Sequence, residues 1–241
     1  MSEGAAPLAG RTALVTGASK GIGAATAEAL AAAGAHVILT GRDVRALEAV
    51  EDRIHAQGGT ATIAPVDLAE TDGIARLASA VAGRWDKLDI LVICAAYMPG
   101  LTPVVHIDGK QLGQAITVNV LATQALLALF DPLLKRSVAA RVIGLTSSVG
   151  ETPRAYWGAY GATKAAFDNL IDTYGQEVGN ISAIRVAILD PGATRTAMRA
   201  KAYPGEDPLT VKEPAQVGER IVAMLAEDFP NRHRERVETS R

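Results

Sequence analysis

The chain has 241 residues, of which 49% are hydrophobic and 21% charged, and its formal net charge at pH 7 is −2. This charge gives no bulk electrostatic basis for binding nucleic acid or an anionic membrane, and the single cysteine, Cys94, excludes an internal disulfide and fits a reducing compartment. The amino terminus lacks the basic and apolar regions of a signal peptide, and no apolar run approaches the roughly 18 residues of a membrane span. We therefore expect a cytoplasmic protein with no membrane and no nucleic-acid partner.

Strand and helix candidates alternate along the chain. Short runs rich in apolar and β-branched residues predict strands, and Ala- and Leu-rich stretches bounded by capping residues or glycine predict helices. The predicted strands are 12–16, 36–40, 60–64, 88–95, 140–146 and 184–189, and the predicted helices are 22–33, 44–57, 70–84, 108–136 and 155–179. Alternation without repeats or linkers favours a single α/β domain over 1–241, a doubly wound parallel sheet that binds ligands at the carboxyl ends of its strands.

A glycine-rich loop joins the first predicted strand to the first predicted helix. It reads Thr16-Gly17-Ala-Ser19-Lys20-Gly21-Ile22-Gly23. Gly17 permits a tight turn, Gly21 lets the backbone approach a pyrophosphate, and Gly23 allows close packing of helix on strand. A strand before the loop and a helix after it are typical of phosphate binding at the positive end of a helix dipole. We predict that Gly17, Ser19, Lys20, Gly21, Ile22 and Gly23 bind a dinucleotide; a glycine-rich turn without a ligand is the alternative.

The end of the second predicted strand, Thr40-Gly41-Arg42-Asp43, indicates which dinucleotide is bound. NAD-binding proteins place an acid here for the ribose 2′-hydroxyl, and NADP-binding proteins place a basic side chain nearby. Gly41 stands where the acid is expected, Arg42 follows it, and Lys20 can reach the same 2′-phosphate. Asp43 is the evidence for NAD, but a role as helix N-cap explains it. The sequence therefore favours NADP over NAD.

Tyr160 and Lys164 stand four residues apart in the stretch Tyr156-Trp-Gly-Ala-Tyr160-Gly-Ala-Thr-Lys164. On a helix this spacing places both side chains on one face, one turn apart. A phenol has an ordinary pKa of about 10, and an adjacent ammonium lowers that pKa because it favours the phenolate. The pair is a candidate acid/base device, and two ordinary helix residues are the alternative.

Together these motifs resemble those of the short-chain dehydrogenase/reductase family over nearly the whole chain. They stand in the family's order: Thr16-Gly17-x-x-x-Gly21-x-Gly23, Asp67, Asn119, Ser147, Tyr160-x-x-x-Lys164 and Pro191-Gly192-x-x-x-Thr196. The stretch from Pro191 to Arg199 looks most like a bacterial subgroup of poorly characterised oxidoreductases. The resemblance implies a Rossmann-type fold and hydride transfer between NADP and a carbonyl or alcohol substrate. A dinucleotide-sensing protein without turnover is the alternative.

The resemblance also implies further cofactor contacts. Asp67 contacts the adenine with Leu68 beside it, although an acid that caps the next helix is the alternative. The turn at Pro191 lies beside the nicotinamide carboxamide and the phosphates. This chain has Ile93-Cys94-Ala95-Ala96 where the family commonly has Asn-Asn-Ala-Gly, a segment that lines the cofactor. The implied contacts are Asp67, Leu68, Ala95, Tyr160, Lys164, Pro191, Gly192, Thr194 and Thr196.

The resemblance implies a catalytic set of Asn119, Ser147, Tyr160 and Lys164. Ser147 lies thirteen positions before Tyr160 and holds the substrate carbonyl; Ser148 is its rival, but Gly150, three residues after Ser147, selects Ser147. Asn119 marks a local break in a helix, and its carbonyl binds a water linked to Lys164. Lys164 lowers the pKa of Tyr160 and anchors the nicotinamide ribose. The four histidines show no ligand spacing, so we predict no metal site.

Four further expectations concern the periphery of the molecule. Residues 1–10 are expected to be flexible, and the Pro- and Gly-containing segment 197–213 is a candidate substrate lid. Tyr97, Met98, Pro153, Trp157 and Tyr203 are candidates for lining a substrate pocket, and core or interface packing is the alternative for Trp157. The segment 231–241 is either a charged edge strand or a frayed tail. The helices 108–136 and 155–179 are similar to those that join family subunits, which implies a homodimer or homotetramer.

Overall fold

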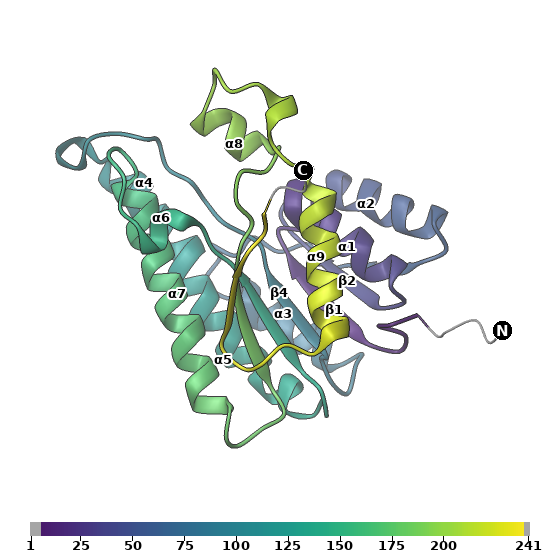
Figure 1. Cartoon of the computed structure of the whole chain (residues 1–241). Helices are drawn as coiled ribbons and strands as arrows, with labels where there is room; N and C mark the ends of the chain where they lie inside the picture. Colours follow the sequence, from purple (N-terminus) through teal and green to yellow (C-terminus); the bar gives the residue numbers. More distant parts are fainter. Residues whose placement is uncertain (1–5, 239–241) are drawn as a thin grey trace.

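The computed structural model describes residues 6–238 (Figure 1). Seven strands form one sheet in the order β3-β2-β1-β4-β5-β6-β7, and every neighbouring pair is parallel. The strands are β1 (Thr12–Thr16), β2 (His36–Thr40), β3 (Thr60–Ile63), β4 (Ile90–Ile93), β5 (Arg141–Leu145), β6 (Arg185–Asp190) and β7 (His233–Arg236). The predicted doubly wound α/β class is confirmed.

Helices cover both faces of the sheet (Figure 1). They are α1 (Gly21–Ala32), α2 (Val44–Ala56), α3 (Gly73–Ala82), α4 (Gly109–Ile116), α5 (Ala122–Lys135), α6 (Ser148–Glu151), α7 (Gly158–Val178), α8 (Ala197–Ala202) and α9 (Pro214–Glu227), with the short helical turns η1 (Val104–His106), η2 (Thr117–Leu121) and η3 (Pro208–Thr210). One core joins the sheet to α1, α2 and α9, and a second joins it to α3, α5 and α7. Successive side chains of β1 alternate between the cores, Val15 in the first and Leu14 in the second, because side chains alternate across a strand.

Several elements differ from expectation. Helix α3 begins at Gly73 rather than at residue 70, because turns occupy the segment before it, one of them closed by Asp67, which accepts a hydrogen bond from the Ala69 amide. Helix α9, which begins at Pro214, was not predicted. The segment 6–10 was expected to be flexible, yet Leu8 is fully buried and its amide donates to the Ala33 carbonyl; residues 1–5 lie outside the described part of the chain. Of the two alternatives for the carboxyl-terminal segment, an edge strand forms at His233–Arg236, and residues 239–241 lie outside the description.

The segment Gly109–Lys135 is helical throughout and contains an 18-residue window with a mean hydropathy of 1.5. Within residues 6–238 it is the one helix whose length and composition would allow it to cross a membrane, so the expectation that no stretch has this character is wrong. A helix in the core of a soluble protein meets the same criterion. Here Leu126, Phe130 and Leu133 pack in the core beneath the sheet.

Candidate functional site

A cavity of about 310 Å³ opens at the carboxyl ends of the central strands. It lies where the topology of a parallel sheet places ligand sites. The predicted site residues that line it are Gly17, Ser19, Lys20, Gly21, Ile22, Gly23, Arg42, Asp67, Leu68, Ala95, Tyr160, Lys164, Pro191 and Thr196. Asn119, Ser147, Gly192 and Thr194 are not among its lining residues.

The glycine loop between β1 and α1 has the geometry that its sequence predicted. Gly17 and Gly21 have φ angles of 67° and 57°, a region that favours glycine. A Cβ atom at Gly23 would lie 2.2 Å from the Gly17 carbonyl oxygen, so only glycine lets α1 begin this close to the strand. Gly21, Ile22 and Gly23 of the first turn of α1 line the cavity, and the amino terminus of a helix is an arrangement that fits a phosphate group.

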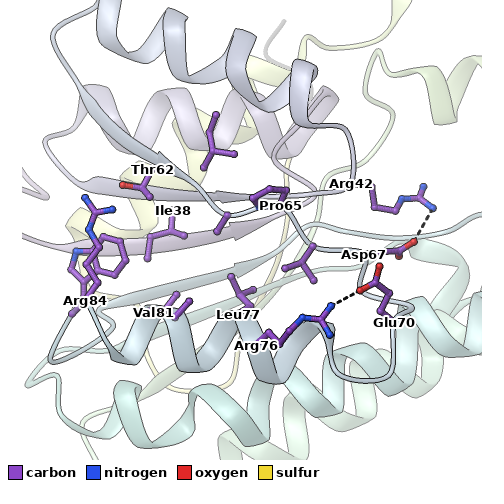
Figure 2. A pocket seen from close by; sticks show the side chains of 15 residues that line it. Ile38, Arg42, Thr62, Pro65, Asp67, Glu70, Arg76, Leu77, Val81 and Arg84 are labelled. Carbon is purple, nitrogen blue, oxygen red and sulfur yellow. Dashed lines mark hydrogen bonds and ion pairs between the residues drawn. The ribbon is translucent and has the colours of Figure 1, made fainter.

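Basic and acidic side chains meet at one corner of the cavity. Figure 2 shows Arg42 beside Asp67, with a distance of 3.9 Å between Nη1 of Arg42 and Oδ2 of Asp67. Lys20 and Arg42 are exposed. Asp43 caps α2 by accepting a hydrogen bond from the Ala46 amide at 3.1 Å, so its presence is explained without a ribose contact.

An open groove of about 770 Å³ runs from this corner between α3 and the strands β2 and β3 (Figure 2). Apolar side chains such as Ile38, Leu77 and Val81 line its middle, and Arg84 lines its far end. Arg42 and Asp67 line both the groove and the cavity. The two spaces are therefore adjacent at the corner that the sequence assigns to the adenosine end of the cofactor.

Helix α7 carries Tyr160 and Lys164, and both side chains are buried. The Lys164 ammonium donates to the Leu145 carbonyl at 2.7 Å and lies 5.8 Å from the centroid of the Tyr160 ring. Burial lowers the pKa of Lys164 to about 8. Burial also raises the pKa of Tyr160, and the carboxylates of Asp190 and Asp168 raise it further.

These directions correct one expectation. We expected Lys164 to lower the pKa of Tyr160, but the pKa is raised in this arrangement, and desolvation of the phenol is the largest cause. The spacing of the two residues predicted their shared helix face and could not predict how deeply that face is buried. The phenol consequently stays protonated around neutral pH.

Asn119 lies in η2, a π-helical break between α4 and α5. The local break that the family resemblance implied is therefore present. The Asn119 side chain accepts from the Tyr97 amide at 2.7 Å and donates to the Tyr97 carbonyl and to Thr163 Oγ1, both at 2.9 Å. The backbone carbonyl of Asn119 accepts a hydrogen bond from the Thr123 hydroxyl at 2.9 Å. Asn119 thus joins the loop after β4 to α7, a structural role that the sequence did not reveal.

Ser147 precedes the short helix α6 and follows Thr146, which lines the cavity. Its rival Ser148 accepts a hydrogen bond from Arg154 at 3.0 Å. A Cβ atom at Gly150 would lie 3.0 Å from the Lys164 backbone carbon. Glycine at this position therefore lets α6 pack against α7, beside the tyrosine and lysine.

Lys212 is a buried residue of the site region that sequence reasoning missed. Its ammonium donates to the Pro191 carbonyl at 2.9 Å and to the Val237 carbonyl at 2.7 Å. Its backbone pairs with Thr194 in a parallel bridge and accepts from the Arg195 amide. Lys212 thus fixes the turn at Pro191, the base of the segment 197–213 and the chain after β7. No motif in the sequence marks it, because its partners are backbone atoms distant along the chain.

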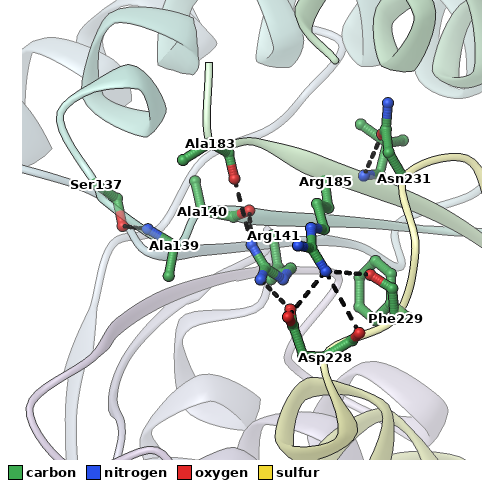
Figure 3. Close-up of polar contacts among 10 residues, drawn as sticks. Ser137, Ala139, Ala140, Arg141, Ala183, Arg185, Asp228, Phe229 and Asn231 are labelled. Carbon is green, nitrogen blue, oxygen red and sulfur yellow. Dashed lines mark hydrogen bonds and ion pairs between the residues drawn. The ribbon is translucent and has the colours of Figure 1, made fainter. Parts of the chain in front are cut away.

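The segment that leads into β7 is held at the amino ends of β5 and β6, away from the cavity (Figure 3). Asp228 pairs with buried Arg141 on β5 and with Arg185 on β6. Arg185 also donates to the Phe229 carbonyl at 3.1 Å, and Asn231 accepts from the Val186 amide at 3.0 Å. These contacts align β7 with β6, which brings Val237 to Lys212.

Comparison with known proteins agrees with this geometry. The family model for short chain dehydrogenases matches residues 11–207. The uncharacterized oxidoreductase YciK of Escherichia coli is 34% identical, over 90% of this chain and 87% of that protein. A short chain dehydrogenase structure from Pseudomonas syringae is 37% identical with a TM-score of 0.93, covering 97% of both chains. A structure from Shigella flexneri, complexed with NADP, is 32% identical with a TM-score of 0.92, covering 97% of this chain and 99% of that one.

Proposed function

The chain belongs to the short chain dehydrogenase family, and we propose that it is an NADP-dependent oxidoreductase acting on a carbonyl/alcohol pair. The observation that carries this proposal is the meeting of Tyr160, Lys164 and the glycine loop around one cavity. A phosphate-binding loop and a buried proton donor that line one cavity are what hydride transfer between a nicotinamide and a carbonyl requires.

The residues present fit the cofactor. The glycine cradle between β1 and α1 lines the cavity with Gly17, Gly21 and Gly23, which carry no side chains that would keep a pyrophosphate from the backbone. Arg42 and Lys20 would bind the 2′-phosphate, Asp67 and Leu68 the adenine, and the segment around Pro191 and Thr196 the nicotinamide end. The neighbour from Shigella flexneri, which holds NADP, supports NADP over NAD. When bound, the reduced cofactor supplies the hydride.

The chain's own residues would handle the proton. Tyr160 donates its phenolic proton to the substrate oxygen. Ser147, which follows β5 beside α7, donates a hydrogen bond to the same oxygen. Lys164 holds positive charge near the phenol, and Asn119 orients the loop at Tyr97 and the helix at Thr163.

A panel of carbonyl compounds with NADPH tests the proposal. We expect NADPH oxidation that depends on the carbonyl compound and a clearly lower Michaelis constant for NADPH than for NADH. A clear preference for NADH would contradict the cofactor assignment. NADPH binding without turnover of any carbonyl or alcohol would instead indicate a dinucleotide-sensing protein.

We further propose that the enzyme is a cytoplasmic homodimer or homotetramer with no membrane or nucleic-acid partner. Apolar side chains on the outer face of the segment Gly109–Lys135 support this: Ile116, Leu121 and Leu129 are 40%, 57% and 40% exposed. In a homo-oligomer, a second copy of the chain would cover these side chains. A monomer mass by light scattering at micromolar concentration would contradict the proposed assembly.

A further inference from the structure

A row of aromatic rings leads from Tyr160 to the segment that follows Thr196. The Trp157 ring lies 6.1 Å from the Tyr160 ring and 5.8 Å from the Tyr203 ring, centroid to centroid. Trp157 immediately precedes α7, and Tyr203 immediately follows α8. Met98 and Ala202 pack into the same cluster. Trp157 and Tyr203 are not among the residues that line the cavity, but Trp157 packs beside Tyr160, which does. The rings therefore form an apolar wall at the border of the cavity, next to the candidate proton donor.

Arg199 fixes the far end of this wall. Its guanidinium carbon lies 3.7 Å from the centroid of the Tyr203 ring. Its Nε donates to Glu206 Oε2 at 2.7 Å, and its Nη2 donates to Glu206 Oε1 at 2.5 Å. The fork of the guanidinium is thus occupied by a carboxylate of the same chain, and its planar face by Tyr203.

The backbone next to Trp157 is held in an unusual conformation. Tyr156 has a φ of 73°, which is strained for an aromatic residue. Its carbonyl accepts a hydrogen bond from the Thr102 amide at 3.1 Å, which helps to hold it. Strain of this kind persists where the surrounding structure demands a particular side-chain direction. The next residue is Trp157, whose ring packs beside Tyr160.

We propose that Trp157 and Tyr203 form the specificity wall of the substrate site, and that the wall selects uncharged carbonyl compounds with an aromatic or similarly flat apolar group. The inference deepens the proposed function and rests on it. A flat apolar group gains by packing against aromatic rings. A carboxylate packed against Trp157 and Tyr203 would lose its hydration, and the cation that stacks on Tyr203, the Arg199 guanidinium, is already paired with Glu206.

Two ketones of similar shape test the selection: 1-phenyl-1,2-propanedione, which is uncharged, and phenylglyoxylate, which carries a carboxylate. With NADPH, we expect kcat/KM for the uncharged ketone to exceed that for phenylglyoxylate by about tenfold or more. Trp157→Ala should raise KM for the uncharged ketone about tenfold with kcat nearly unchanged, because the lost contacts bind substrate and transition state alike. Trp157→Phe should restore most of the affinity.

The sharpest test is Glu206→Gln, a change of charge at constant shape that frees Arg199. We expect kcat/KM for phenylglyoxylate to rise about fivefold or more while that for the uncharged ketone stays within about twofold. The double variant Arg199→Met with Glu206→Gln is the matched control and should lose the gain. Binding of both ketones to NADPH-loaded Tyr160→Phe enzyme, measured by calorimetry, gives the same comparison without turnover.

The outcomes separate the two proposals. Absence of NADPH binding would contradict the proposed function itself. If NADPH binds, three results would overturn the specificity wall alone. They are a preference for phenylglyoxylate, no binding of the uncharged ketone, and a ratio of kcat/KM for the two ketones that Glu206→Gln leaves unchanged.

Discussion

The side-chain amide of Asn119 donates to the hydroxyl of Thr163 at 2.9 Å, and this buried bond joins the π-helical break η2 to the helix that carries Tyr160 and Lys164. Thr163 directly precedes Lys164 in α7. The same amide side chain makes two hydrogen bonds with the backbone of Tyr97. One residue therefore sets the relative positions of the loop after β4 and the catalytic helix.

Replacing Asn119 with Ala should impair both folding and turnover. The change removes three hydrogen bonds and leaves the Tyr97 backbone groups without partners, so we expect the free energy of unfolding to fall by on the order of 3 kcal/mol and kcat by about tenfold or more. Urea unfolding and NADPH-dependent reduction measure the two effects. Thr123→Val is the control, because it removes the bond to the Asn119 carbonyl and leaves the side chain in place. Wild-type turnover in Asn119→Ala would contradict the positioning role.

The buried charge of Lys164 should appear in the pH dependence of stability. Burial lowers its pKa in the folded chain from 10.5 to about 8, so between these values the unfolded chain binds more protons. The free energy of unfolding of the wild type should therefore rise with pH across this interval, relative to Lys164→Met, by on the order of 2 kcal/mol. Urea unfolding near pH 7 and near pH 10 gives the comparison. A flat difference for Lys164→Met would argue against a buried ammonium.

The glycine cradle predicts a contrast between two alanine substitutions. Gly23→Ala would place a methyl group 2.2 Å from the Gly17 carbonyl oxygen, whereas Gly205→Ala meets nothing within 4 Å. We expect Gly23→Ala to weaken NADPH binding by about a hundredfold or to prevent folding, since the loop must open to accept the methyl group. Circular dichroism separates these two results, and fluorescence titration measures affinity. Equal NADPH affinity in the two variants would remove the cradle from cofactor binding.

Lys212 should affect the binding of the cofactor, although it does not line the cavity. Lys212→Met leaves the Val237 carbonyl without its side-chain donor and the Pro191 carbonyl with the Thr194 hydroxyl as its remaining donor. An unpaired buried group costs on the order of 1–3 kcal/mol, and the turn at Pro191 is loosened. We expect KM for NADPH to rise about tenfold with a smaller change in kcat. Trypsin should also cleave the segment 197–213 faster in the variant. If KM and cleavage both match the wild type, the buried lysine has no role in holding the turn.

The sequence predicted those parts of the molecule that depend on local pattern. A few neighbouring residues were enough to predict three features: the strand at Thr12–Thr16, the turn formed by Gly17, Gly21 and Gly23, and the shared helix face of Tyr160 and Lys164. The capping role of Asp43 is local in the same sense.

What the sequence could not predict depends on contacts between distant segments. The bonds of Lys212 go to backbone carbonyls at Pro191 and Val237, which no side-chain pattern marks. The raised pKa of Tyr160 follows from the depth of burial and from Asp190 and Asp168, which only the folded chain brings close. The packing of the Tyr203 ring on Trp157 likewise joins residues that lie far apart in the sequence.

The central claim is that Tyr160 transfers the proton in an NADP-dependent reaction, and Tyr160→Phe tests it most directly. The change removes one hydroxyl from a buried ring and leaves the glycine cradle intact. With NADPH and a carbonyl substrate that the wild type reduces, we predict that turnover of Tyr160→Phe falls by at least about a hundredfold, while its dissociation constant for NADPH stays within a few-fold of the wild-type value. Retained turnover in Tyr160→Phe with NADPH bound would contradict the account.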